Sequence, residues 1–258
     1  MPASIEVVIP VLNEEKDLPP SIAKLHGFME QAFPGRDWRI TVMDNGSTDS
    51  TPDVATRLSS EFNNVGWVRM EQRGRGRAVK RRWLESKADI VSYMDVDLST
   101  DLNHFPQLVG AIEHDGADIA IGSRLMKGSK VINRPPHREV TARGYSTIFR
   151  VTFLTKFHDA QCGFKAISRK AADELLPLVQ DTGWFFDTEL LIIAEKNRYT
   201  IKEVPVKWTD DPDSRVKIIK TAIYDLKGLA RLKFGGLKRA SRALKAGKGA
   251  GATRMAPS

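Results

Sequence analysis

The sequence predicts an α/β fold with a mostly parallel central sheet flanked by helices. Short apolar segments alternate with amphipathic segments of helical length from residue 5 to about residue 208. Polar or acidic residues follow several of the apolar segments directly, as at Asp44 and Asp95. The chain has 258 residues, 41% hydrophobic and 28% charged, which is typical of one large globular domain.

Strand–helix units are expected to follow one another in the N-terminal half. The expected strands are residues 5–11, 38–43, 65–70 and 90–94. The expected helices are residues 18–33, a segment that starts near residue 51, and residues 78–86. Because strand–helix–strand units form right-handed crossovers, these strands should be parallel, with their carboxyl ends at one edge of the sheet.

The second half contains a further strand at residues 118–122 and then a polar stretch rich in Pro, Gly and Arg. That stretch, residues 124–141, predicts a mobile loop. Helices are expected at residues 145–156, 170–179 and 188–197, followed by a strand at 201–208. Residues 1–214 are therefore predicted to form the main domain.

The C-terminal part is strongly basic. Residues 215–258 contain twelve Lys and Arg and one acidic residue, Asp225, a net charge of +11, whereas residues 1–214 carry −3. Residues 215–234 predict a basic amphipathic helix, and residues 235–258 predict a disordered basic tail. This asymmetry indicates contact with a polyanion, either an anionic membrane surface or a nucleic acid.

The length of the apolar runs and the pattern at the N-terminus predict the cellular compartment of the protein. They fall well short of the ~20 residues that a membrane-spanning helix needs. Met1 is followed at once by a strand pattern, without the basic and apolar regions of a secretory signal. We therefore expect a cytoplasmic protein.

Carboxylates gather at the expected carboxyl edge of the sheet: Glu14, Asp44, Asp95 and Asp97. Asp95 and Asp97 flank Val96 directly after an apolar strand, where two carboxylates are costly unless a hard cation neutralises them. Mg²⁺ or Mn²⁺ can bridge such carboxylates to a diphosphate and stabilise the charge of a departing nucleoside diphosphate. The pair predicts a divalent-metal site, although a D-x-D sequence also occurs in solvated loops.

Taken together, the motifs resemble those of the family 2 glycosyltransferases, which have a GT-A (Rossmann-like) fold. The family's general motifs are matched by residues 8–15 (VIPVLNEE), 44–51 (DNGSTDST) and 95–97 (DVD). Within the family, the sequence is most similar to the polyprenyl and dolichyl phosphate sugar synthases. That similarity is carried by residues 73–76 (RGRG), 122–124 (GSR), 143–146 (RGYS), 159–165 (DAQCGFK), 184–190 (WFFDTEL) and 203–208 (EVPVKW).

The resemblance implies a role for each matched residue. Nucleotide binding is expected of Pro10, Asn13, Glu14, Asp44, Gly46, Ser47, Arg75 and Asp95. Asp95 and Asp97 are expected to bind Mg²⁺ or Mn²⁺. The candidate catalytic residues are Asp97, Arg124 and Arg143. The two arginines are expected to hold phosphates, because a guanidinium group matches phosphate oxygens bidentately. The candidates for an acceptor or sugar site are Asp159, Gln161, Trp184 and Asp187.

The implied reaction is an inverting transfer of a hexose from a nucleoside-diphosphate sugar to a polyprenyl or dolichyl phosphate. Residues 161–165 and 186–189 are more similar to the glucose synthases than to the mannose synthases, which favours UDP-glucose and a β-linked product. Ser99 stands where mannose synthases carry a metal-binding glutamine. A phosphate acceptor is already anionic and needs a cationic pocket rather than a general base. The basic helix at 215–234 would contact an anionic membrane peripherally, from the cytoplasmic face.

Several alternatives stay open. The donor could be GDP-mannose with the same lipid acceptor, or the acceptor could be a hydroxyl group, with Asp159 or Asp187 as the base. The C-terminal helix could pack on the domain instead of a membrane. A nucleic-acid-binding module is disfavoured because the basic residues lie apart and lack interleaved aromatic residues.

Overall fold

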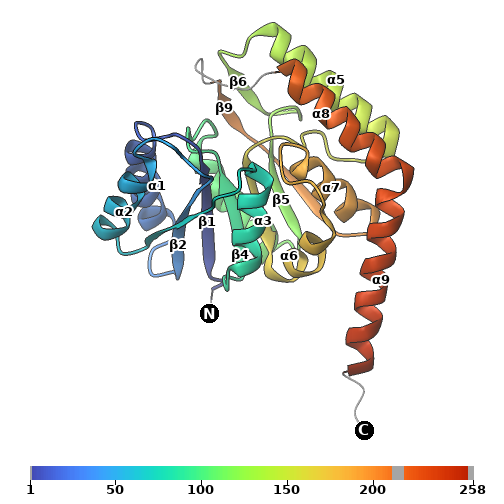
Figure 1. Ribbon diagram of the computed structural model, residues 1–258, viewed down its shortest axis with the longest axis horizontal. Coiled ribbons are helices and arrows are strands. Elements are labelled where there is room, and N and C mark those ends of the chain that lie inside the picture. The colour runs from blue at the N-terminus through green and yellow to red at the C-terminus, as the bar shows by residue number, and fades with distance from the viewer. Residues whose placement is uncertain (1, 211–217, 255–258) are drawn as a thin grey trace.

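The core of the protein is a seven-stranded sheet, seen in a computed structural model that describes residues 2–210 and 218–254 (Figure 1). Its strand order is β3-β2-β1-β4-β7-β5-β8. Only β7 among these strands is antiparallel to its neighbours, so the predicted mostly parallel sheet is confirmed. The strands are β1 (Ile5–Val11), β2 (Trp38–Asp44), β3 (Val65–Arg69), β4 (Ile90–Met94), β5 (Ile119–Ser123), β7 (Phe164–Ser168) and β8 (Ile201–Pro205).

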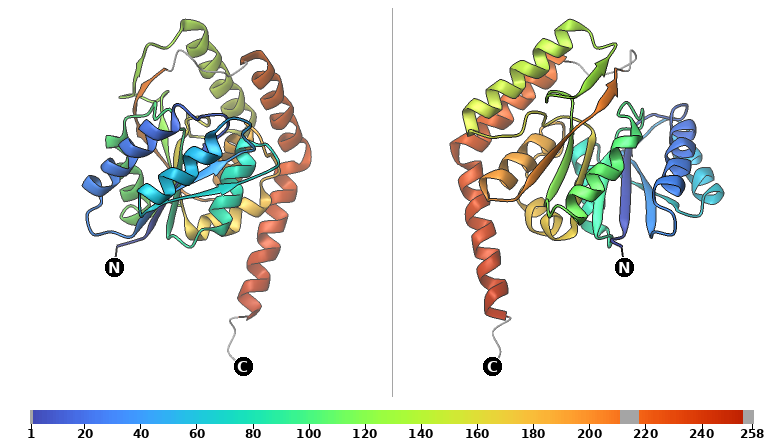
Figure 2. Two further views of the ribbon diagram at one scale, coloured as in Figure 1. Left: turned by 60° about the vertical axis from the view of Figure 1, so that its left-hand side comes forward. Right: turned by 180° about the vertical axis from the view of Figure 1, so that it is seen from behind.

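Helices cover both faces of this sheet, as Figure 2 shows. One layer contains α1 (Leu18–Ala32), α2 (Thr51–Glu61) and α4 (Phe105–Glu113), and the other contains α3 (Arg75–Glu85), α6 (Arg169–Leu175) and α7 (Phe186–Lys196). Neighbouring strand residues such as Val7 and Val8 point to opposite faces and are both fully buried. Continuous apolar strands are therefore explained by burial on both faces.

Two expectations about the second half were wrong. Residues 124–141 are not a mobile loop, because β6 (Lys130–Ile132) pairs with β9 (Lys207–Thr209) and α5 (Pro136–Phe153) begins at a proline in its first turn. The expected strand 201–208 is accordingly divided between β8 and β9. Strand β7 was not predicted, because its position between β4 and β5 depends on long-range pairing rather than on a local pattern.

The C-terminal part of the chain is helical where the structure describes it. Helix α8 (Ile218–Arg231) lies within the stretch 215–234 and runs beside α5 in both figures, whereas residues 215–217 lie outside the described residues. A short turn, η3 (Leu232–Gly236), leads into α9 (Leu237–Arg254), in a stretch for which the sequence predicts a disordered tail. Ala240 and Leu244 of α9 are buried against the main core. Within the described part of the chain, no helix combines the length and apolarity that crossing a bilayer requires.

Candidate functional site

The loops after β1 and β2 are tied together at the carboxyl edge of the sheet. The backbone N–H of Asn13 donates to Ser47 Oγ (2.9 Å), and Asn13 Oδ1 accepts from the backbone N–H of Thr48 (2.8 Å). The N–H of Glu14 donates to Thr51 Oγ1 (2.8 Å). Asn13 has a φ of 58°, which asparagine tolerates better than most residues. These contacts place the predicted nucleotide-binding residues of the two loops beside each other.

Asp44, the last residue of β2, is completely buried below these loops. Its Oδ1 accepts a hydrogen bond from the N–H of Ser47 (3.0 Å). Its Oδ2 has no hydrogen-bond donor among the described residues, and the nearest cation is Arg69 Nη1 at 3.8 Å. A buried acceptor without a donor is costly, so an N–H group of a ligand would stabilise it. Pro10 is half-buried on the adjacent strand β1, in register with Met43.

Gly46 is required by the sharp turn that follows Asp44. Its φ of +75° lies in the left-handed region, and a Cβ there would come within 3.2 Å of the carbonyl oxygen of Glu71. The turn directs the N–H of Ser47 back to Asp44, which is how the predicted nucleoside loop forms.

The D-x-D pair follows β4 directly. The side chain of Asp95 is 42% exposed and Asp97 is exposed, with Asp97 Oδ1 accepting from the N–H of Ser99 (2.9 Å). The N–H of Asp95 donates to the carbonyl of Gly163 (3.2 Å), and a Cβ at residue 163 would overlap the Asp95 carboxylate. Glycine at position 163 therefore lets the segment before β7 approach Asp95.

The donor set of this pair fits a hard divalent cation that is completed by a substrate. No group of three or more His, Cys, Asp or Glu side chains within residues 2–210 and 218–254 could hold a metal alone. Mg²⁺ and related ions are commonly bound by one or two carboxylates together with phosphate oxygens and water. Asp95 and Asp97 would be the two carboxylates of such a site.

Arg75, predicted to bind nucleotide, lies in a buried charge network. Its Nη2 donates to Asp95 Oδ1 (2.5 Å) and its Nη1 to Asp187 Oδ2 (3.0 Å). The guanidinium carbon lies 4.9 Å from the Tyr93 ring centre and 5.1 Å from that of Trp184. Burial opposes the charge of Arg75, but Asp95 and Asp187 outweigh it and raise the pKa well above the usual value. Arg75 thus joins a predicted metal ligand to two predicted sugar-site residues.

Two further members of this network were missed from the sequence. Tyr93 OH donates to Asp187 Oδ1 (2.5 Å), and Lys165 Nζ lies 3.0 Å from the same oxygen. Burial, aided by Asp187, raises the pKa of Tyr93 well above its usual range, which keeps the hydroxyl protonated. A lysine inside the apolar segment FKAIS was the available signal, because buried lysines are almost always paired.

Arg124 and Asp159 form a second buried pair. Nε and Nη2 of Arg124 donate to Oδ2 and Oδ1 of Asp159 at 2.8 and 3.0 Å, and the N–H of Arg124 also donates to Oδ2. Burial alone would raise the pKa of Asp159, but Arg124 lowers it to about 2. Such a carboxylate is poorly suited to accept a proton near neutral pH, and Asp187 is likewise held in ion pairs.

Arg134 is a cationic residue that sequence reasoning did not single out. Arg124 and Arg134 both lie over the ring of Trp208, at 5.3 and 5.5 Å from its centre. Trp208 in turn shares a small cavity with Asp95 and Asp97. Burial and the charge of Arg124 lower the pKa of Arg134, and its buried Nε has no hydrogen-bond partner among the described residues. Its Nη1 already donates to Glu139 Oε2 (3.0 Å), so the Nε is the donor that an anion would use.

Of the other predicted residues, Arg143 lies outside these networks, whereas the backbone N–H of Gln161 and the ring of Trp184 contact them. Arg143 lies on α5 with its side chain 60% exposed and forms an ion pair with Glu139 one turn earlier. Gln161 Nε2 donates to Asp225 Oδ2 of α8 (2.5 Å). Trp184 is half exposed, with its ring over Arg75.

Asp225 is almost fully buried, and this predicts a pH dependence of stability. Burial, with contributions from Asp181 and Asp187, raises its pKa to about 7 although Gln161 lowers it. Between the ordinary carboxyl pKa of about 4 and this value, the unfolded chain releases the proton and the folded chain retains it. The contribution of Asp225 to the free energy of unfolding therefore falls as the pH rises through this window.

Replacing Asp225 by Asn should remove that penalty while keeping an acceptor for Gln161. Thermal melts should show Asp225→Asn more stable than the wild type at about pH 8 and nearly equal to it at about pH 4. An equal difference at both pH values would contradict the assignment.

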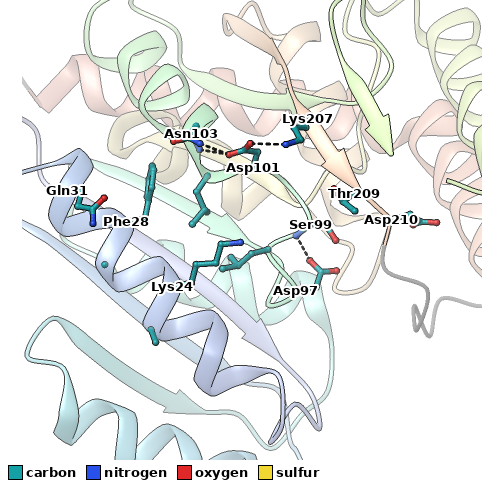
Figure 3. A pocket seen from close by; sticks show the side chains of 14 residues that line it. Lys24, Phe28, Gln31, Asp97, Ser99, Asp101, Asn103, Lys207, Thr209 and Asp210 are labelled. Atoms are coloured by element: carbon teal, nitrogen blue, oxygen red, sulfur yellow. Dashed lines mark hydrogen bonds and ion pairs between the residues drawn. The ribbon is translucent and has the colours of Figure 1, made fainter. Parts of the chain in front are cut away.

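A larger hollow, which Asp97 also lines, is shown in Figure 3. It has a volume of about 750 Å³ and lies between α1, the loop after β4, and β9. Lys24 extends from α1 toward this loop, and Asp101 and Lys207, which both line the hollow, form an ion pair at 3.8 Å. Asp97 lines both this hollow and the small cavity that contains Asp95. Asp97 therefore stands between the two spaces.

The fold and the site together define a class of protein. A mostly parallel sheet carries at its carboxyl edge a buried carboxylate suited to a nucleoside, and beside it a D-x-D pair suited to a metal and a diphosphate. This is the arrangement of GT-A nucleotide-sugar transferases. The chain belongs to glycosyl transferase family 2, whose family model matches residues 6–176.

Individual relatives agree with this family. The chain is 33% identical over 217 residues to glycosyltransferase AglD of Haloferax volcanii, covering 84% of this chain but 35% of AglD. It is 31% identical to dolichyl-phosphate beta-glucosyltransferase ALG5C of Trichomonas vaginalis, covering 84% of this chain and 68% of that protein. The chain thus spans about a third of the first relative and about two thirds of the second.

The fold also matches a solved structure. Glucosyl-3-phosphoglycerate synthase from Mycobacterium tuberculosis, in complex with Mn²⁺ and UDP-glucose, superposes with a TM-score of 0.65 at 22% identity. The match covers 90% of this chain and 79% of that chain. At this identity the match supports the predicted GT-A fold.

Proposed function

We propose that this protein is an inverting glucosyltransferase that moves glucose from UDP-glucose to a polyprenyl or dolichyl phosphate, giving a β-linked lipid-phosphate glucose. The observation that carries the proposal is the ion pairing of Asp159 and Asp187, the two carboxylates that were candidates for a general base. Asp159 and Asp187 are both held in ion pairs with arginine, which suits an acceptor that is already anionic. The relative from Trichomonas, named for glucosyl transfer to dolichyl phosphate, supports the same acceptor.

The donor side uses the carboxyl edge of β1, β2 and β4. Asp44 Oδ2 would accept an N–H of the uracil base, with Pro10 and the loops at Asn13, Glu14 and Ser47 around it. Asp95 and Asp97 would hold Mg²⁺ or Mn²⁺, which when bound neutralises charge on the leaving nucleoside diphosphate. Arg75 keeps one oxygen of Asp95 in place through a direct hydrogen bond.

The acceptor side needs cations to overcome repulsion between the acceptor phosphate and the donor diphosphate. Arg124 and Arg134 on the ring of Trp208 supply positive charge next to Asp95 and Asp97. Arg143 was also predicted to contact the acceptor phosphate. Because it lies on α5, it would do so where the lipid phosphate extends to that helix. Attack by the acceptor phosphate on the face opposite the diphosphate inverts the anomeric carbon.

A membrane surface fits the outward faces of α5 and α8. Large apolar side chains are exposed there: Val140, Ile148, Val151 and Leu154 around α5, and Ile223, Leu226 and Phe234 in the C-terminal part. Lys233 Nζ donates to the carbonyl of Thr152 (2.8 Å), so the apolar residues of α5 and those of the C-terminal part lie close together. Asp225 is the one acidic residue from 220 to 247, and it is buried. We therefore propose peripheral binding to anionic lipid on the cytoplasmic face, without a nucleic-acid partner.

Changing an exposed valine of this surface to an acid should weaken membrane binding. Val151 is 70% exposed, so Val151→Glu should fold normally while losing apolar contact and adding repulsion from anionic lipid. Co-sedimentation with phosphatidylglycerol vesicles should show about a tenfold weaker partition. Leu84→Glu, at an exposed leucine of α3, is the matched control and should bind as the wild type does. Equal losses in both variants would argue against this surface.

The proposed reaction is tested with a panel of donors. UDP-glucose, UDP-galactose, UDP-N-acetylglucosamine and GDP-mannose are each supplied with Mn²⁺ and a short polyprenyl phosphate, and the lipid-linked sugar is measured. Glucose should be transferred in preference to the other sugars. Preferred transfer from GDP-mannose would contradict UDP-glucose as the donor. Transfer to glycerol or a sugar hydroxyl without the lipid would contradict a polyprenyl phosphate as the acceptor.

A further inference from the structure

Phe185 and Phe186, which precede and begin α7, are each packed against a glycine of another helix. A methyl group at residue 228 of α8 would overlap the Phe185 ring, and one at residue 76 of α3 would overlap Phe186. Both phenylalanines are essentially fully buried. Since neighbouring side chains in a packed core have little room to move, the position of this segment depends on both helices.

The start of α3 is shaped to receive the same segment. Gly74 has a φ of +152°, and a Cβ there would come within 2.6 Å of the carbonyl oxygen of Thr182. The N–H of Arg77 donates to that carbonyl (3.1 Å). The glycines of the RGRG sequence thus let residues 182–186 lie directly on the N-terminus of α3.

Helix α8 makes further polar contacts with the segment around α7. Tyr224 OH donates to Asp181 Oδ2 (2.7 Å). Arg231 binds Glu189 bidentately, with Nη1 and Nη2 at 2.9 and 2.8 Å from its two carboxylate oxygens. The Arg231 guanidinium also lies over the Phe185 ring, 5.9 Å from its centre. Helix α8 is therefore docked on residues 181–189 at both ends of the segment.

The residues on either side of the two phenylalanines belong to the charge network of the site. Trp184 covers the guanidinium of Arg75, and Asp187 binds Arg75 Nη1 at 3.0 Å. Arg75 Nη2 in turn holds Asp95 Oδ1. A displacement of Phe185 would therefore move two partners of Arg75 and, through Arg75, the carboxylate of Asp95.

We propose that α8 is a positioning element of the donor site. Through Gly228 and Phe185 it holds Trp184 and Asp187, which hold Arg75 on Asp95. The assignment of Asp95 to the donor site rests on the proposed function. Helix α8 would then have two roles. Its outward face, with Ile223, Leu226 and Lys227, contacts the membrane, and its inward face fixes the geometry of a site that binds a nucleoside diphosphate and a divalent cation.

The test is Gly228→Ala in the chain of 258 residues. The methyl group should displace Phe185 and raise the Kd of UDP in the presence of Mn²⁺ about tenfold, measured by isothermal titration calorimetry. Co-sedimentation with phosphatidylglycerol vesicles should be unchanged, because the outward side chains are untouched. Gly110→Ala on α4, where a Cβ would make only an ordinary contact with His114 Cδ2 at 3.9 Å, is the matched control and should leave both values as in the wild type.

A compensating change distinguishes positioning from general damage. Phe185→Leu added to Gly228→Ala narrows the side chain that the methyl group meets, so the double variant should recover most of the lost UDP affinity. Tyr224→Phe removes only the hydrogen bond to Asp181 and should raise the Kd about two- to threefold, even if Gly228→Ala fails to fold.

Three results would overturn the proposal. The first is an unchanged Kd in folded Gly228→Ala. The second is a raised Kd that Phe185→Leu does not relieve. The third is a wild-type Kd in Tyr224→Phe. Failure of the wild type itself to bind UDP or any other nucleotide of the donor panel would instead reject the proposed function, and this inference with it.

Discussion

Asp97→Ala is expected to reduce glucosyl transfer about a hundredfold or more. Asp97 is exposed at the boundary between two hollows and is one of the two carboxylates suited to the divalent cation. Removing a group that stabilises charge developing in the transition state typically costs about 10²–10³ in rate. The rate should be measured with UDP-glucose, Mn²⁺ and a short polyprenyl phosphate, with the Mn²⁺ concentration varied. Mn²⁺ affinity should fall together with the rate.

Asp101→Asn is the matched control for this experiment. Asp101 lines the same hollow as Asp97, and it accepts a hydrogen bond from the N–H of Asn103 that an asparagine can also accept. Its transfer rate should stay within about twofold of the wild type. A wild-type rate in Asp97→Ala, or an equal loss in both variants, would contradict the assignment of Asp97.

Asp159→Asn is expected to lower the free energy of unfolding more than the other substitutions proposed for this protein. Three hydrogen bonds from Arg124 converge on this buried carboxylate, and its neutralisation would leave a buried guanidinium without a counter-charge. Breaking a buried ion pair in this way typically costs about 3–5 kcal/mol. Urea denaturation near pH 7 should show a loss of that order in the free energy of unfolding.

The pH dependence of the same difference is a second check. The pKa of Asp159 is lowered to about 2 in the folded chain, below the ordinary value of about 4 in the unfolded chain. The stability that its charge contributes is therefore fully present above about pH 4 and is lost as the pH falls through about 2. Asp173→Asn, which breaks the exposed pair with Arg169, is the control and should cost less than about 1 kcal/mol. Similar losses in the two variants would contradict the role of Asp159.

The parts of the fold that local patterns determine were predictable. Strands β1, β2 and β4 are apolar segments that end at or shortly before Asn13, Asp44 and Asp95, so their identity and the carboxyl edge could be inferred together. Strand β7 could not, because FKAIS is short and becomes a strand by pairing with β4 and β5. The start of α5 was missed because its proline-rich N-terminus also resembles a loop.

The members of the site were predictable as residue types, but their partners were not. Arg75 and Arg124 were expected to face phosphates, and the structure pairs them with Asp95, Asp187 and Asp159. These partners are between 20 and 112 residues away in the chain, so no local spacing reveals them. The D-x-D sequence and the loop at Asp44, by contrast, follow single strands and could be recognised directly.

The anomeric configuration of the product tests the central claim most directly. UDP-glucose, which is α-linked, is supplied with Mn²⁺ and a short polyprenyl phosphate, and the purified glycolipid is examined by proton NMR. Attack by the acceptor phosphate without a covalent intermediate predicts a β-linked glucosyl phosphate. An α-linked product, or glucose attached only to a hydroxyl acceptor, would contradict the account.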